Sequence, residues 1–126
     1  MRGWWLGLLV ACDGGEPEPT GPTLSGDVQP LFSRNCATYG CHGGPELQTG
    51  LDLNEGAAHG SLVGVASAQR PEMLRVAPGE PDASYLLVKM RGEADEGDLM
   101  PPGFAPLAET DLSVVEEWIA AGALDD

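Results

Sequence analysis

Basic residues are scarce in this chain of 126 residues, which has 6 Lys and Arg against 20 Asp and Glu and a formal net charge of −14. A chain this acidic repels phosphate and lacks the basic stripe that holds a nucleic-acid backbone. Long apolar runs are also missing, since none reaches the roughly 18–20 residues that cross a bilayer. The sequence therefore argues against a nucleic-acid-binding protein and contains no candidate transmembrane helix.

Large apolar side chains are few as well. Leu, Ile, Val and Phe number 27 of 126 residues, about 21%, just above the roughly 20% below which a highly charged chain stays disordered. Gly and Pro together number 29. The length suggests one domain, but a chain so short of core needs a disulfide, a metal or a large cofactor to fold.

Residues 1–11 are typical of an export signal. Arg2 gives a positive start, and the apolar stretch after it is too short for a membrane span. The stretch ends in Leu9-Val10-Ala11-Cys12, which resembles the lipobox of bacterial lipoproteins, whose cysteine is acylated after cleavage. The alternatives are a buried N-terminal strand and a mis-chosen start codon.

Residues 12–22 are polar and rich in turn formers, so we expect Cys12 to carry lipid at the start of a flexible linker, before a domain at residues 23–126. The expected location is the periplasm or cell envelope, with the membrane bound through the lipid because anionic headgroups repel the acidic chain. Exported cysteines end up paired, ligated or covalently used. Lipidation of Cys12 leaves Cys36 and Cys41 to be accounted for.

Short helical patterns separated by loops predict an all-α domain. Four helices are expected, each beginning at a polar residue that can cap it: 27–35 from Asp27, 54–58 from Asn54, 82–90 from Asp82 and 110–121 from Thr110. Residues 62–66 and 73–77 are β-prone and predict a small hairpin. A long loop covers residues 93–106, and loops of this length in a compact domain usually wrap something.

The most informative segment is Cys36-Ala37-Thr38-Tyr39-Gly40-Cys41-His42, two cysteines followed directly by a histidine. Covalent haem attachment requires this pattern, because each thiol adds to one vinyl group and the adjacent imidazole ligates the iron. The usual spacer has two residues, whereas this one has four. Three alternatives stay open: a Cys36–Cys41 disulfide, a zinc site with His59 as a further ligand, and a nucleophilic cysteine.

Met100 stands directly before two prolines in a polar loop, away from any periodic apolar face. The prolines fix φ and stiffen the loop, which suits a thioether that must hold a weak bond to iron. Ligation by Met and His is an arrangement of c-type cytochromes and raises the reduction potential. Met90 and Met73 are rivals, but Met90 fits a helix core and Met73 falls in the expected hairpin.

Several separated blocks of the sequence match a known family in order. They are residues 28–32, 41–43, 50–53, 78–86, 100–102 and 118–123. Together they resemble the planctomycete-type cytochrome c domain, a class I-like c-type cytochrome. The resemblance implies short helices wrapped around one covalent haem c, with Cys36 and Cys41 as thioether sites, His42 as proximal ligand and Met100 as distal ligand. It also implies that the first and last helices cross.

The expected function is electron transfer by a monohaem cytochrome cycling between Fe(II) and Fe(III), without enzymatic activity. The alternatives are a haem enzyme or ligand sensor of peroxidase-like type, and a haem-free lipoprotein module held by a Cys36–Cys41 disulfide. Acidic residues 93, 95, 96 and 98 form either a solvated loop or a patch that steers a redox partner with a basic docking face. The haem would supply the missing core, so we expect the haem-free chain to be largely unfolded.

Overall fold

The computed structural model describes residues 21–95, 99–101 and 107–126. Of these residues about 42% are helical and 7% form isolated β-bridges, which agrees with the expected all-α class. The elements in order are η1 (Leu24–Val28), α1 (Gln29–Asn35), η2 (Gln48–Gly50), α2 (Ala58–Leu62), η3 (Pro81–Ala83), α3 (Tyr85–Met90) and α4 (Glu109–Ala120). No helix in the described ranges is long and apolar enough to cross a membrane. The expected export signal and Cys12 lie outside the described residues.

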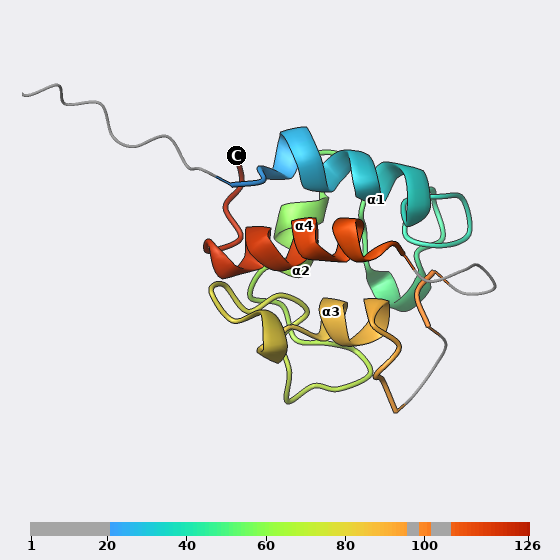
Figure 1. The fold of residues 1–126 in the computed structure, drawn as a ribbon. Helices are drawn as coiled ribbons and strands as arrows, with labels where there is room; N and C mark the ends of the chain where they lie inside the picture. Colours follow the sequence, from blue (N-terminus) through green and yellow to red (C-terminus); the bar gives the residue numbers. More distant parts are fainter. Residues whose placement is uncertain (1–20, 96–98, 102–106) are drawn as a thin grey trace, which may run out of the picture.

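Helix α4 lies at the centre of the fold, between the first helical segment and α3 (Figure 1). It contacts η1, η3 and α3. Its buried residues Val115, Trp118 and Ile119 share one face, as their helical spacing predicts. Trp118 and Phe32 are both almost fully buried and belong to the same hydrophobic cluster. The first and last helical segments therefore pack against each other, with their contact at η1.

Hydrogen bonds tie the two ends of the described domain together. The Leu24 N–H donates to Asp126 Oδ1 and the Ser25 N–H donates to Asp126 O, each at 3.0 Å. On the other side of α4, the Gly79 N–H donates to Ile119 O at 2.8 Å. These bonds hold α4 between the beginning of the domain and the loop before η3.

The first helical segment begins earlier than predicted. Thr23 caps it, with its Oγ1 accepting from the Gly26 N–H at 3.0 Å. Asp27, the predicted cap, lies inside the first turn, and its Oδ2 accepts from the Thr23 N–H at 2.9 Å. The prediction was wrong by one turn because Thr23 and Asp27 share the capping, an arrangement that resembles a capping box.

Helices α3 and α4 also begin at other residues than predicted. Ser84 precedes α3 and Ala108 precedes α4, and neither makes a capping bond with its side chain. Asp82 lies within η3, because Pro81 starts a separate short turn before α3. Thr110 lies in the first turn of α4, so both predicted caps were wrong.

The short helix expected from Asn54 is displaced along the chain, since α2 begins only at Ala58. The Ala57 and Ala58 amides donate to the main-chain oxygen of Asn54, at 3.0 and 3.1 Å. The Asn54 side chain donates to Asp52 Oδ1 at 2.8 Å. Asn54 therefore forms the turn that leads into α2 rather than capping the helix.

Residues 62–66 and 73–77 lie beside each other but do not form the predicted hairpin. A parallel bridge joins Val63 to Val76 and an antiparallel bridge joins Ala66 to Leu74, so no continuous ladder exists in this described part. Gly64, with φ of +73°, turns the first segment, which prevents regular strand pairing. The hairpin prediction identified the right neighbours and the wrong secondary structure.

Candidate functional site

A cavity of about 660 Å³ opens between the cysteine motif, the residue 48–53 loop and α3. Its wall includes Cys36, Cys41, His42 and Met100, the four residues that the sequence predicts as haem contacts. The volume lies within the range of about 300–1,000 Å³ that small-molecule and cofactor sites occupy. The fold therefore brings together a set of predicted ligands that come from distant parts of the chain.

The cysteine motif begins directly at the end of α1 and closes on itself. The Cys36 N–H donates to Phe32 O at 2.8 Å, which continues the helical bonding of α1. At the other end of the motif, the His42 N–H donates to Cys36 O at 3.1 Å. The chain leaves α1 at Cys36 and comes back to Cys36 at His42. Both ends of the motif therefore stay at the cavity.

The residues between the two cysteines form a turn, in which Thr38 and Gly40 line the cavity. The Cys41 N–H donates to Thr38 O at 3.0 Å, and Gly40 adopts φ of +79°, which favours glycine. Tyr39, in the middle of the turn, is 82% exposed and does not line the cavity. The long spacer is therefore accommodated by exposing Tyr39, while Thr38 and Gly40 stay at the cavity wall.

Cys36 and Cys41 are both free thiols and both are partly buried. Burial, and secondarily the neighbouring Cys41, raises the pKa of the Cys36 thiol to about 11. A thiol with this pKa stays protonated near neutral pH and is a weak nucleophile. In this structure Cys36 is therefore a protonated thiol that is not joined to Cys41.

His42 is buried, and its ring is oriented by a main-chain oxygen. Nδ1 lies 3.2 Å from Leu51 O, and because a carbonyl can only accept, Nδ1 carries the proton in this bond. Burial lowers the pKa of His42 below its ordinary value, although carbonyl bonds to Leu51 and Gln48 oppose the shift and Arg75 adds to it. A neutral imidazole with Nδ1 engaged in this way keeps Nε2 as the ligating nitrogen.

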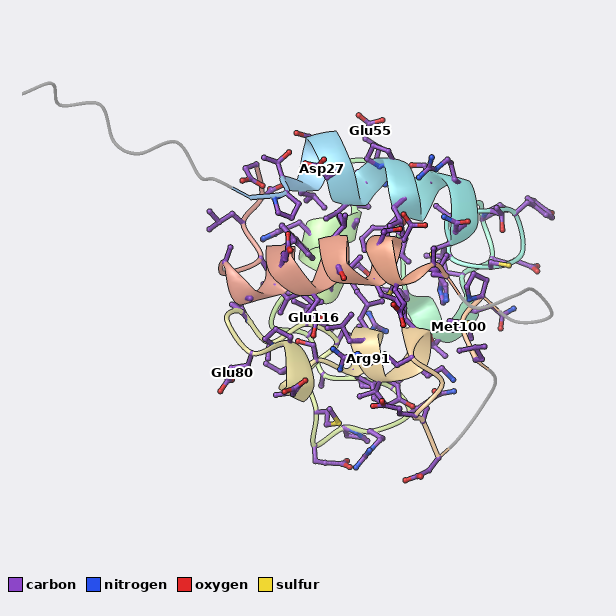
Figure 2. The ribbon with its side chains drawn as sticks, in the orientation of Figure 1. Asp27, Glu55, Glu80, Arg91, Met100 and Glu116 are labelled. Carbon is purple, nitrogen blue, oxygen red and sulfur yellow. The ribbon has the colours of Figure 1, made fainter. Side chains whose placement is uncertain are left out.

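Met100 lies at the cavity wall and is anchored to α3. Its N–H donates to Lys89 O at 3.2 Å, and Figure 2 shows its side chain beside α3. Of the two rivals, Met73 does not line the cavity. Met90 does, but it is also buried within the hydrophobic cluster, as the helical pattern predicts.

The second histidine lies apart from the motif. His59 Nε2 is 2.9 Å from Ala123 O, and His59 is not part of the cavity wall. Within the described ranges, no three His, Cys, Asp or Glu side chains are grouped to hold a metal ion. A zinc site built from Cys36, Cys41, His42 and His59 therefore does not fit this arrangement.

Sequence reasoning missed the cationic part of the wall. Arg34, Arg75 and Lys89 line the cavity, and together they are half of the six basic residues of the chain. Lys89 is buried, as is Tyr85, whose hydroxyl donates to Gln69 Oε1 at 2.9 Å. The scarcity of basic residues was the available signal, because the few cations of so acidic a chain are candidates for a specific role.

Gly43 provides a test of the motif geometry, because its backbone packs directly on the spacer. A Cβ at this position would lie 2.3 Å from Ala37 O. We expect Gly43→Ala to displace the motif and lower the free energy of unfolding by about 1–3 kcal/mol, the usual effect of overpacking. The measurement is chemical denaturation of the purified protein.

Gly60→Ala is the matched control, since Gly60 lies in α2 and a Cβ there meets nothing within 4 Å. Alanine also favours the helix, so this variant should be neutral or slightly stabilised. Equal denaturation midpoints for the two variants would contradict the described packing of the motif.

Comparison with known proteins gives no relative from which a function can be carried over: no family model, curated protein or solved structure matches the chain. The functional argument therefore depends on the residues of the cavity wall and their chemistry.

Proposed function

We propose that this protein is an exported, lipid-anchored monohaem c-type cytochrome that carries single electrons. The observation that supports the proposal most directly is that Cys36, Cys41, His42 and Met100 line one cavity of cofactor size. The proposal includes a cytochrome c-like fold at residues 23–126, after an export signal at 1–11 and a linker at 12–22 that begins with acylated Cys12. The resemblance of the separated sequence blocks to the planctomycete-type cytochrome c domain points to the same function.

The donor set of the wall fits a covalently bound haem c. The Cys36 and Cys41 thiols would each add across one vinyl group, with the thiol hydrogen passing to the vinyl carbon, so attachment needs no oxidant. His42 Nε2 and the Met100 sulfur would be the protein ligands of the iron. A bound haem supplies a one-electron iron couple, Fe(II)/Fe(III), whose potential the axial ligands set.

The remaining wall residues suit the same group. Arg34, Arg75 and Lys89 bring positive charge to a cavity in an otherwise acidic protein, which favours a cofactor that carries carboxylates. The hydrogen bond from the Met100 amide to Lys89 O holds the distal residue against α3. With His42 and Met100 as its protein ligands, a bound haem would exchange electrons rather than bind a substrate.

Covalent haem attachment is the first test. Protein matured in a bacterial periplasm should give a c-type pyridine haemochrome spectrum, and intact mass spectrometry should find one haem and an acylated Cys12. Alkylation under denaturing conditions should then find no free thiol. We expect the Cys36→Ser/Cys41→Ser double variant to lack both haem and a cooperative melt, because nothing fills its cavity. Mature wild-type protein without a tetrapyrrole would contradict the proposal.

Replacement of Met100 distinguishes an electron carrier from a haem enzyme. In Met100→Ala we expect loss of the methionine–iron charge-transfer band and a fall in reduction potential on the order of 0.1 V, within the roughly 0.8 V that axial ligands span. Met73→Ala, which changes a methionine away from the cavity wall, should keep both properties. A retained charge-transfer band in Met100→Ala would refute distal ligation by Met100 and point to Met90, the other methionine of the wall. A wild-type protein without the band would favour an enzyme or sensor with an open sixth position.

The acidity of the chain predicts a redox partner with a basic docking face. Glu93 and Asp95 are exposed near the end of α3, while residues 96 and 98 of the predicted patch lie outside the described residues. Electron exchange with a cationic cobalt complex should therefore slow as salt is added, because salt screens the attraction.

The double variant Glu93→Gln/Asp95→Asn should weaken this salt dependence. Glu55→Gln/Glu80→Gln removes the same number of charges at positions that Figure 2 shows far from Met100, and should leave it nearly unchanged. The same salt dependence in both double variants would contradict the proposal that Glu93 and Asp95 attract the cationic partner.

A further inference from the structure

We infer that Arg75 is the positioning residue of the proximal ligand, because its guanidinium fixes the loop whose Leu51 carbonyl orients the His42 ring. The inference rests on the proposed function, since it assigns a residue that acts on an iron ligand of that site. Arg75 comes from the segment before α3, and no sequence motif points to it.

The loop of residues 48–53 determines how the His42 ring is held. Leu51 O receives the Nδ1–H of His42 at 3.2 Å, and the Leu53 N–H donates to His42 O at 2.8 Å. Directly before Leu51, Thr49 and Gly50 adopt φ of +55° and +69°. Left-handed backbone is unfavourable for threonine, so this turn needs support from outside.

Arg75 supplies that support from across the cavity wall. Its Nη2 donates to Thr49 O and its Nη1 donates to Ser61 O at the end of α2, each at 2.9 Å. Ser61 also holds the loop with its side chain, since the Asp52 N–H donates to Ser61 Oγ at 3.0 Å. The guanidinium therefore links the left-handed turn to Ser61 of α2. Ser61 in turn binds the loop at Asp52, two residues after the turn.

The backbone of Arg75 is itself fixed on both sides. Its N–H donates to Val65 O at 2.7 Å, and its carbonyl oxygen accepts from the Leu86 N–H of α3 at 3.0 Å. A planar guanidinium offers several N–H groups in a fixed geometry, whereas a lysine ammonium is a point donor on a flexible stem. Arg75 can therefore hold two carbonyls at once from a rigid base, and lysine would keep the charge but not this geometry.

The test uses the holoprotein with Arg75→Gln and Arg75→Lys. Arg91→Gln is the matched control, because Arg91 also holds two partners, Asp82 at 3.3 Å and Glu116, but lies outside the cavity wall (Figure 2). The three measurements are amide hydrogen exchange at Leu53, the paramagnetic NMR shifts of the His42 ring, and the reduction potential.

In both Arg75 variants we expect the Leu53 amide to exchange about tenfold faster, as loss of one charge-assisted hydrogen bond gives. The His42 ring shifts should change in both variants, with Arg75→Lys between Arg75→Gln and the wild type. The potential should move in Arg75→Lys as well, although the charge is kept. Arg91→Gln should lower the thermal midpoint without altering the ring shifts.

Three other outcomes are informative. If haem is attached and both Arg75 variants keep the wild-type ring shifts and Leu53 exchange, the inference is wrong while the proposed function stands. If the potential moves only in Arg75→Gln and the ring shifts stay constant, Arg75 acts through its charge alone, which also overturns the positioning role. A wild-type protein without haem would refute the proposed function and this inference together. If Arg75→Gln does not attach haem, the ring shifts and Leu53 exchange of Arg75→Lys test the inference alone.

Discussion

The hydrogen bond between His42 Nδ1 and the Leu51 carbonyl connects the local chemistry of the cysteine motif to the rest of the fold. It fixes which ring nitrogen carries the proton and so which one can ligate a metal. The carbonyl belongs to a loop without regular strand or α-helix, so its position depends on bonds from other elements. The orientation of the His42 ring is therefore only as well defined as the contacts of that loop with α2 and with Arg75.

The distribution of apolar and charged side chains explains why a cavity forms beside the core. The hydrophobic cluster gathers around α4, where Val115, Trp118 and Ile119 meet the first helical segment. Loops rather than helices form much of the remaining wall, and half of the basic residues of the chain lie there. In the described part of the chain, every buried side-chain nitrogen or oxygen has a hydrogen-bond partner. The wall is mainly apolar with a few cationic and polar groups set into it, which is the composition typical of a ligand or cofactor site.

Local patterns predicted the features that depend on neighbouring residues. The face of α4 followed from the spacing of Val115, Trp118 and Ile119, and the motif at residues 36–42 is contiguous in the sequence. The predicted helix starts were wrong because each was assigned to a capping side chain. Thr23 and Asp27 share the capping of the first segment, and α3 and α4 begin without a capping bond from a side chain. Arg75 could not be predicted, because its partners are main-chain carbonyls 14 and 26 residues away, which carry no side-chain signature.

The four-residue spacer shows why spacing alone is a weak description of such a motif. Counted along the chain, the longer spacer separates Cys36 from His42 more than the usual pattern does. In space, the bond from the His42 N–H to Cys36 O closes the segment, and the spacer forms a turn in which Tyr39 is exposed. Gly40 and Gly43 make this possible, the first through its left-handed backbone and the second through its close approach to Ala37. The two thiols and the imidazole therefore share one wall because the loop is closed at its base, whatever number of residues the turn contains.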